Sequence, residues 1–476
     1  MSAGAHTSDV AVLVCGDLEP AGELAAADGR LGHGVELRVI AQLCDRPEAA
    51  AAALRELSVK RVVLGLCRHR PSRELLGALR RAGAEPFAIE TVILGGHRAE
   101  AAALLDGAAA RLQGLQPGER GRPALGSGDI SRRALFAPRA MLDYAPVAIV
   151  EPHACIGSRG CGLCAIACPV AAVDVSNERP LIDTSSCTAC AACVTVCPSG
   201  AIRLSGCSRE QVEAQLEALL GRVVGIVFAC SSADAEAPAG WALVELPTLA
   251  LLTPAWILQA RLRGAEVRLA PCGEACCADS GAVMELSERI AGDARGCVGE
   301  QSTRPQLAEP AGTVEAVLAL VPDCEPRRIE HRASPLGLLE LDRDSCTLCG
   351  ACTIACPSDA LALRQDAAEM ALTLEPSACV GCDRCTAVCP EDALSVRRGV
   401  DSERLRAGQS VLMQAKRDHC MVCATELPPL SMRRRLRELL PELSETPGGL
   451  CVTCATRAVR QPAAAAPKSD RAWWSG

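Results

Sequence analysis

The chain has 476 residues, a formal net charge of −8 and a pI near 5.6. An acidic chain lacks the basic stripe that nucleic-acid binding requires, so nucleic acid is excluded as a partner. Thirty cysteines are present, many of them in tight C-x-x-C groups, a spacing that suits metal ligation better than structural disulfides. Aromatic residues make up only 2% of the chain, so small aliphatic side chains must fill the core.

The amino-terminal sequence, MSAGAHTSDVAVLVC, has neither the basic segment nor the long apolar run of a secretory signal. The most apolar stretch, residues 241–260, contains Glu245 and two prolines. It is expected to form a buried strand and helix and not a membrane span. Clustered free thiols persist in reducing compartments. We therefore expect a cytoplasmic protein with no direct membrane span.

Residues 1–120 alternate short apolar runs with alanine-rich amphipathic stretches. This order predicts an α/β domain with a parallel sheet and helices on both faces. Strands are expected at 10–14, 35–40, 61–66 and 87–93, and helices at 46–57, 71–82 and 97–113. Residues 121–145, in a region rich in Gly, Pro and Arg, are expected to be a linker.

Residues 207–335 return to the α/β pattern. Strands are expected at 223–229, 242–247 and 266–270, and a helix at 254–263. The tail, residues 463–476, has the composition of a disordered segment.

Residues 336–398 contain two cysteine runs with the spacing C-x2-C-x2-C-x3-C-P. The runs are Cys346, Cys349, Cys352 and Cys356, then Cys379, Cys382, Cys385 and Cys389. Three closely spaced thiolates can wrap one [4Fe–4S] cubane, and in two-cluster ferredoxins the fourth cysteine ligates the other cluster. We therefore assign Cys389 to the cluster of the first run and Cys356 to the cluster of the second. Zinc sites rarely use this tandem spacing.

Residues 146–206 contain a similar pair of runs. They are Cys155, Cys161, Cys164 and Cys168, then Cys187, Cys190, Cys193 and Cys197. The same crossing assigns Cys197 to the first cluster and Cys168 to the second. Five residues separate Cys155 from Cys161, and two glycines there would let the loop bulge. A three-iron cluster or a non-cysteine ligand is the alternative to ligation by Cys155.

Residues 399–462 carry two further C-x-x-C pairs around a basic helical insert. The pairs are Cys420 with Cys423 and Cys451 with Cys454. Two such knuckles resemble a zinc ribbon, and a structural zinc site is expected. A fifth cubane and unmetallated thiols are the alternatives.

Three cysteines of the first α/β domain follow predicted strands: Cys15, Cys44 and Cys67. In a parallel sheet they share the carboxyl edge, where α/β proteins bind ligands. We expect a metal or redox role, with simple packing as the alternative, and His69 and His97 are weak candidates for a fourth ligand.

In the second α/β domain the corresponding cysteines are Cys230, Cys272, Cys276 and Cys277. Four thiols at one sheet edge could hold a [2Fe–2S] cluster, or they serve packing or docking. Cys207, Cys297 and Cys324 receive no role. The expected fold is thus multidomain α/β and α+β: two parallel-sheet α/β domains, two bacterial-type ferredoxin domains and a zinc-ribbon-like module.

Several segments carry a family resemblance. VAVLVCGD at 10–17, LC at 43–44, VVLGLCRHR at 62–70 and AGAEPFAIETVI at 82–93 resemble the N-terminal domain of the heterodisulfide reductase A subunit. IVFACSSADAE at 226–236 and GAEVRLAPCGEACC at 264–277 resemble the delta subunit of methyl-viologen-reducing hydrogenase. Ala233 and Pro247 stand where that subunit has cysteines. No G-x-G-x-x-G turn occurs, so FAD is not expected.

The resemblance and the cysteine runs together predict an iron–sulfur electron-transfer subunit of a cytoplasmic redox complex of heterodisulfide reductase or hydrogenase type. Four [4Fe–4S] clusters would relay single electrons to or from dehydrogenase, hydrogenase or reductase subunits. No P-loop, nucleophile elbow or zinc-protease motif is present, so the catalytic centre is expected in a partner. The alternatives are a stand-alone reductase with its substrate site at the Cys230 group, and an iron–sulfur cluster carrier.

Overall fold

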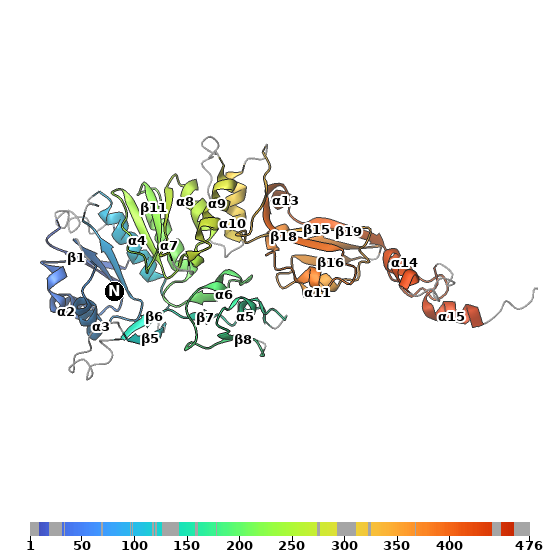
Figure 1. Ribbon diagram of the computed structural model, residues 1–476, viewed down its shortest axis with the longest axis horizontal. Helices are drawn as coiled ribbons and strands as arrows, with labels where there is room; N and C mark the ends of the chain where they lie inside the picture. The colour runs from blue at the N-terminus through green and yellow to red at the C-terminus, as the bar shows by residue number, and fades with distance from the viewer. Residues whose placement is uncertain are drawn as a thin grey trace, which may run out of the picture. The chain divides into compact units, whose positions relative to one another are not determined.

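The structure is a computed structural model of the chain (Figure 1). It describes residues 9–18, 31–32, 34–67, 70–95, 97, 99–116, 119, 121–125, 142–157, 160–177, 179–273, 277–292, 311–321, 325–366, 368–439 and 449–460. Several predicted features lie outside these residues: the tail, the middle of the linker, His69, Cys276, Cys297 and Cys324. The chain divides into two compact units, residues 1–336 with 398–406, and residues 337–397 with 407–476, and each unit is described by itself.

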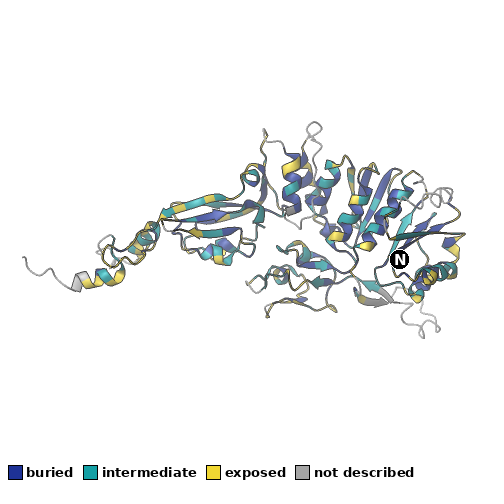
Figure 2. Cartoon of the chain, turned by 180° about the vertical axis from the view of Figure 1, so that it is seen from behind, coloured by how far each residue is buried: buried dark blue, intermediate teal, exposed yellow. Residues whose placement is uncertain are grey.

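The first unit begins with a four-stranded parallel sheet. Its strands are β1 (Val10–Cys15), β2 (Val35–Ile40), β3 (Val62–Leu66) and β4 (Ile89–Ile93), in the order β2-β1-β3-β4. Every residue of β1 and β3 is buried, as expected for β-branched and aliphatic strands in the middle of a parallel sheet (Figure 2). The four predicted strands are confirmed to within two residues at their ends.

Helices cover both faces of this sheet, as predicted. They are α2 (Pro47–Leu57), α3 (Arg73–Ala82) and α4 (Ala101–Gln113). The connections from β2 to β3 and from β3 to β4 run in the same direction, so right-handed crossovers put α2 and α3 on one face. Figure 1 shows α4 on the other side of the sheet. A side chain at Gly65 would meet Leu105 of α4 at 3.2 Å, so the glycine lets this helix lie close to the sheet.

A second parallel sheet follows in the same unit. Its strands are β11 (Gly225–Cys230), β12 (Trp241–Leu246) and β13 (Glu266–Ala270), in the order β12-β11-β13. Its helical elements are α7 (Arg209–Leu219), η5 (Leu249–Leu251), α8 (Pro254–Leu262), α9 (Ser280–Ala291) and α10 (Ala311–Leu320). The apolar stretch 241–260 thus forms a strand and most of a helix, as predicted. Among the described residues, no helix combines the length and apolar character needed to cross a bilayer.

Helices α4 and α7 pack against each other and join the two α/β domains. The buried Arg111 of α4 lies at this junction. Its Nη1 donates to Gln215 Oε1 at 3.0 Å and to the Glu245 carbonyl at 2.8 Å, and its Nε forms an ion pair with Glu90 at 3.2 Å. Burial raises the pKa of Glu90, and the neighbouring guanidinium opposes this rise. A paired charge satisfies polar groups that the junction would otherwise leave buried and unpaired.

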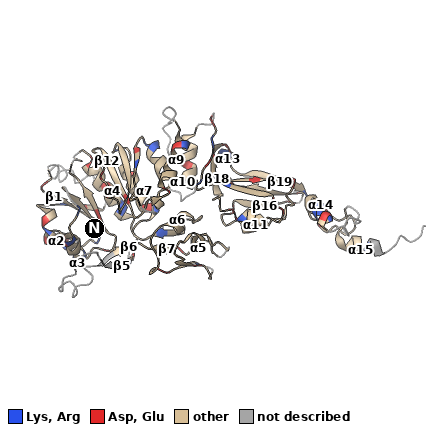
Figure 3. Cartoon of the chain, in the orientation of Figure 1, with Lys and Arg blue, Asp and Glu red and all other residues tan. Residues whose placement is uncertain are grey.

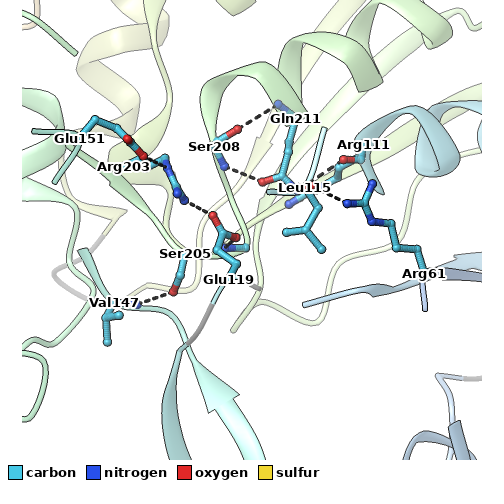
Figure 4. A network of polar contacts seen from close by, with 11 residues as sticks. Arg61, Arg111, Leu115, Glu119, Val147, Glu151, Arg203, Ser205, Ser208 and Gln211 are labelled. Carbon is cyan, nitrogen blue, oxygen red and sulfur yellow. Dashed lines mark hydrogen bonds and ion pairs between the residues drawn. The ribbon is translucent and has the colours of Figure 1, made fainter. Parts of the chain in front are cut away.

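A second polar network connects the first cysteine-rich segment, residues 146–206, to the α/β domains (Figure 4). Glu119 accepts from the Gly206 N–H at 2.6 Å and pairs with Arg203, whose Nε reaches Glu151 at 3.0 Å. Arg203 lies on β10 (Ile202–Leu204), which pairs antiparallel with β7 (Ala148–Val150). The first cysteine-rich segment therefore has fixed anchors within the first unit.

The remaining elements of this segment are short. They are α5 (Leu163–Ala167), β8 (Val173–Asp174), β9 (Leu181–Ile182) and α6 (Ala192–Thr195). The predicted linker differs from the structure at both ends, because β5 (Arg122–Leu125) pairs antiparallel with β6 (Leu142–Ala145). The linker is thus closed at its base by a two-stranded ribbon.

The first unit is completed by residues far along the chain. Strand β14 (Arg328–Glu330) pairs with the end of β18 (Leu394–Asp401), and α13 (Ser402–Ala407) follows. Val400 and Leu405 are buried with Ile329, Leu336 and residues of α8, α9 and α10. The predicted domain boundary at residue 399 differs from the structure here, since residues 398–406 belong to this core and not to a C-terminal module.

The second unit contains the other cysteine-rich segment. Its elements are β15 (Gly337–Leu341), α11 (Ala351–Ala355), β16 (Leu361–Gln365), β17 (Glu369–Leu374), η7 (Pro376–Ala378), α12 (Arg384–Ala387), β19 (Ser410–Lys416), α14 (Leu430–Leu439) and α15 (Val452–Arg460). Strands β16, β17 and β19 form an antiparallel sheet. Residues 410–416 therefore extend the ferredoxin-type segment, again in contrast to the predicted boundary. Helix α14 has no buried residue and carries several arginines (Figure 3).

Candidate iron–sulfur and thiolate sites

In the second unit, four thiols from both runs line one open cavity. They are Cys346, Cys349, Cys352 and Cys389, around about 390 Å³ of unfilled space. Burial, together with the charges of Cys346, Cys349 and Cys389, raises the pKa of Cys352 to about 11. Four thiols that raise one another's pKa are costly to ionise unless a cation neutralises them, and the irons of a cubane do this.

The other four thiols of this unit form the complementary group. Burial is the largest cause that raises the pKa of Cys385 to about 12, and the charges of Cys379, Cys382, Cys356 and Cys352 contribute to the same rise. Cys356 is likewise the first charge to act on Cys379 after burial and local hydrogen bonding. Cys356 thus lies with the second run, and Cys389 with the first. This is the grouping that crossed ligation requires.

The first unit contains thiol groups that correspond to those of the second unit. Cys168, Cys187, Cys190 and Cys193 line a cavity with about 340 Å³ of unfilled space. Burial and these neighbours raise the pKa of Cys193 to about 12. Cys164 has its pKa raised by burial and by the charges of Cys161 and Cys197. The half-buried Cys155 donates its N–H to the Glu151 carbonyl at 3.2 Å, and its place as a ligand stays a prediction.

The loops that carry these thiols share one backbone pattern. In three runs, the residue two after the first cysteine and the residue after the second are left-handed. They are Ala189 and Ala191, Leu348 and Gly350, and Gly381 and Asp383, with φ between 56° and 78°. These reversals curl a short loop around a single centre. In the run with the insertion, Gly162 has φ −135° instead, so the longer loop reaches its site by a different path.

Backbone N–H groups point at several of the sulfurs. Ala172 N donates to Cys168 Sγ at 3.2 Å, Leu348 N to Cys346 Sγ at 3.4 Å, and Ala393 N to Cys389 Sγ at 3.3 Å. Hydrogen bonds of this kind stabilise the thiolate form and raise the reduction potential of a cluster. The loops therefore supply both ligands and tuning groups.

The C-terminal pairs form a set of their own. Cys420, Cys423, Cys451 and Cys454 have sulfurs within 4.8 Å of one another, and Cys423 Sγ lies 3.6 Å from Cys451 Sγ. Two thiolates about 2.3 Å from one tetrahedral zinc ion lie about 3.8 Å apart. The set therefore has the size of a four-thiolate site for one ion, which fits the predicted zinc better than a cubane.

Zinc retention at this site is expected to depend on pH. Hydrogen bonds from the N–H groups of Cys451 and Cys423 lower the pKa of Cys420 to about 6, whereas Cys454 has a pKa raised to about 12 by its thiol neighbours. Binding must displace a proton from Cys454 at neutral pH, so affinity falls as the pH falls, with a further loss below about pH 6 as Cys420 protonates. Zinc transfer from the full chain to a chromophoric chelator, followed from about pH 8 to about pH 5, measures this dependence.

The matched variant Cys423→Ser is expected to lose about one zinc per chain at every pH, because a closed site needs all four ligands. Retention of zinc by this variant, or loss of four irons in place of one zinc, would contradict a zinc site.

The three strand-end thiols of the first sheet come together as predicted. Cys44 Sγ lies 3.4 Å from Cys67 Sγ, and Cys67 Sγ lies 3.9 Å from Cys15 Sγ. Burial raises the pKa of Cys44 to about 12. Burial opposes ionisation of Cys15 as well, but N–H donors from Asp17 and Cys44 lower its pKa overall. His97 lies outside this set, and its buried Nδ1 has no hydrogen-bond partner within the described ranges.

The second sheet also gathers three thiols at its carboxyl edge. Cys230, Cys272 and Cys277 have sulfurs within 4.8 Å of one another, and Cys272 Sγ lies 3.4 Å from Cys277 Sγ. Cys276 lies outside the described residues, so the predicted fourth thiol of this group stays a prediction. Element η5, which follows β12 beside this edge, packs against α6, the helix that carries Cys193. The loop that follows this sheet edge therefore lies beside the helix that carries Cys193.

One buried cysteine belongs to no set among the described residues. Cys207 lies 3.8 Å from Arg111 Nη2, in the junction between α4 and α7. Sequence reasoning left Cys207 without a role and missed Arg111, because an arginine in an alanine-rich helix looks like a solvent-exposed residue. The signal that could have revealed Arg111 is its position on the same helix face as the apolar residues 104, 105, 108 and 112.

Comparison with known proteins agrees with the cubane pockets. Residues 154–201 and 345–393 each match the family described as 4Fe-4S dicluster domain. The chain is also similar to one subunit of the ion-translocating oxidoreductase complex of Methanosarcina acetivorans, with 45% identity over 49 residues. That alignment covers 10% of this chain and 19% of the relative, so the chain spans about a fifth of the relative's length. The paired 4Fe-4S domains and this similarity support an iron–sulfur electron-transfer role.

Proposed function

We propose that this chain is the electron-transfer subunit of a cytoplasmic redox complex of heterodisulfide reductase or hydrogenase type. Four [4Fe–4S] clusters in two ferredoxin-type pairs pass single electrons between partner subunits. The observation that carries the proposal is the thiol grouping. In the second unit Cys356 lies with the second run and Cys389 with the first, and in the first unit Cys168 lies with the second run and Cys197 near Cys164 of the first.

Within each pair, the two clusters are close enough for direct electron exchange. The charge of Cys352, in one group, acts on Cys385 in the other, and Cys164 acts on Cys193 in the same way. Thiols of the two groups therefore lie within range of each other's charge, which supports electron exchange between the two clusters. Each cubane accepts and donates one electron, so each pair works as a two-step relay.

The sheet-edge thiols extend this relay on one side. We place a [2Fe–2S] cluster at Cys230, Cys272, Cys276 and Cys277, since two-iron clusters take four thiolates. The contact between η5 and α6 would bring it beside the cubane pocket of Cys193. Structural zinc at the C-terminal set has no redox role in this scheme.

A role within a complex is favoured over independent catalysis by the sites themselves. Two cavities of the described residues are lined by the cubane thiols, and the relative named above is part of an oxidoreductase complex. A stand-alone reductase would need a substrate site at the Cys230 group. A cluster carrier would need labile clusters. Crossed ligation, in which each run supplies one ligand to the other run's cluster, does not suit a labile cluster.

The proposed function predicts activity only together with a partner. The chain reduced by dithionite should be reoxidised rapidly by an artificial one-electron acceptor, and the isolated chain should not oxidise NADH, hydrogen or formate. Addition of the co-purifying partner protein should create one of these activities. Stopped-flow bleaching of the cluster absorbance and steady-state assays measure both.

The variants Cys385→Ser and Cys193→Ser should lower the coupled rate without loss of complex formation, because each removes one relay centre. Cys207→Ser is the matched control, since it changes a buried cysteine outside the cluster groups. Rapid NADH oxidation by the isolated chain with stoichiometric flavin would overturn the proposal.

A further inference from the structure

The spacing of the three thiols at the first sheet edge sets them apart from the cubane ligands. Cys15, Cys44 and Cys67 have all their sulfurs within 4.8 Å of one another. Within the described ranges, the ferredoxin-type runs contribute to no set this tight. Ligands of one tetrahedral ion lie about 3.8 Å apart, whereas cubane ligands sit on different irons and lie farther apart. The spacing suits one metal ion, and the equally close set of Cys230, Cys272 and Cys277 differs from it in having Cys276 as an expected fourth thiol.

Rigid elements hold the three thiols in place. Cys15 is the last residue of β1 and is fully buried, and Cys67 directly follows β3. Cys44 lies in η1 (Leu43–Asp45), which begins after the left-handed Gln42 with φ 54°. The N–H groups of Asp17 and Cys44 donate to the Cys15 sulfur. Donors aimed at a sulfur favour its thiolate form, which is the form that binds metal.

The second sheet has thiols at two equivalent positions. Val14, next to Cys15, pairs with Gly65, two residues before Cys67. Ala229, next to Cys230, pairs with Ala270, two residues before Cys272. The third thiol differs, since it comes from η1 in the first sheet and from Cys277 in the second. In each sheet a different loop thus adds a third thiol to the same kind of edge site. Thiols that only packed in the core would not need to be brought together in this way.

The first pocket holds too few thiols for a cluster with full cysteine ligation. Three cysteines form the set, and all other described cysteines except Cys155 and Cys207 lie in other groups. Two-iron and four-iron clusters with full cysteine ligation take four thiolates, whereas a single zinc or iron ion accepts three thiolates and one exchangeable ligand.

We propose that Cys15, Cys44 and Cys67 bind one divalent metal ion, zinc or ferrous iron, at the carboxyl edge of the first α/β sheet, and that its fourth coordination position is open to water or another small ligand. This site is separate from the four cubanes of the proposed relay, and it stands whether or not the chain acts as an electron-transfer subunit.

Metal and sulfide analysis of the full chain tests the site. The background carries Cys423→Ser and Cys451→Ser, so that the C-terminal set no longer contributes an ion. Adding Cys44→Ser or Cys67→Ser is expected to remove about one zinc or one iron per chain and no sulfide. Adding Cys207→Ser, the matched control, should remove none. The reduced-state EPR of the cubanes, unchanged throughout, shows that each variant is folded.

Loss of no metal, or loss of about two or four irons together with sulfide, would overturn the proposal, because the second result identifies a cluster. A further variant, Cys44→His, separates metal binding from packing. Imidazole is a zinc ligand, so Cys44→His should keep more of the ion than Cys44→Ser. If the thiols only packed, the larger histidine would disturb the edge more than serine, and neither change would alter the metal content.

Discussion

The anaerobically purified chain is expected to contain at least about sixteen iron atoms with matching acid-labile sulfide, because four cubanes hold four irons each. Both cysteine-rich segments contain eight thiols, and in each of them four thiols drawn from both runs line one open cavity. Iron and sulfide analysis, with EPR of the dithionite-reduced protein, measures the content. Spin coupling between neighbouring clusters should broaden the spectrum at full reduction.

A fully reconstituted sample with about eight irons or fewer would contradict four cubanes, since one of the two pairs would then be empty. The exact iron content depends on whether Cys155 is a ligand. If Cys155 is not a ligand, its cluster is expected to appear in the three-iron form, which has its own EPR signal when oxidised, and the iron content should fall by about one.

Crossed ligation predicts which double variants lose more iron than the corresponding single variants. Cys356→Ala and Cys382→Ala are expected to damage the same cluster, so the double variant should lose about four irons, like each single variant. Cys356→Ala with Cys349→Ala should damage both clusters and lose about eight. Iron analysis and integrated EPR intensity distinguish these outcomes.

The mirror pair is the control. Cys389→Ala should add no loss to Cys349→Ala and should double the loss of Cys382→Ala. If Cys356 instead shares its cluster with Cys349, the two double variants exchange their results, and the crossed assignment is wrong. The same design applies to Cys168 in the first unit, with Cys190 as its expected clustermate.

The parallel sheets were predictable from the residues of their strands. Runs such as VAVLV and VVLGL are apolar on both faces, which is typical of strands covered by helices on each side. Cysteines directly after such strands had to meet at one edge, and the distances among Cys15, Cys44 and Cys67 confirm this. The local spacing of the cysteine runs likewise identified the ferredoxin-type segments.

Features that depend on partners far away in sequence were not predictable. Arg111 reads as a surface residue of an alanine-rich helix until α7 and β12 bring Gln215 and the Glu245 carbonyl to it. The pairing of β5 with β6 bridges a Gly- and Pro-containing segment that has no strand pattern of its own. Strand β19 joins β17 across several other elements, so the predicted boundary at residue 399 followed the cysteine spacing and missed the sheet.

The return of residues 398–406 to the first unit has a consequence for how the chain folds during synthesis. Val400, Ser402 and Leu405 are buried against residues that precede position 337. The ribosome must therefore release the whole segment 337–397 before the first unit can close its core. Until then, Ile329 and Leu336 lack part of their apolar cover. The second pair of cysteine runs is thus synthesised before the first unit can complete this part of its core.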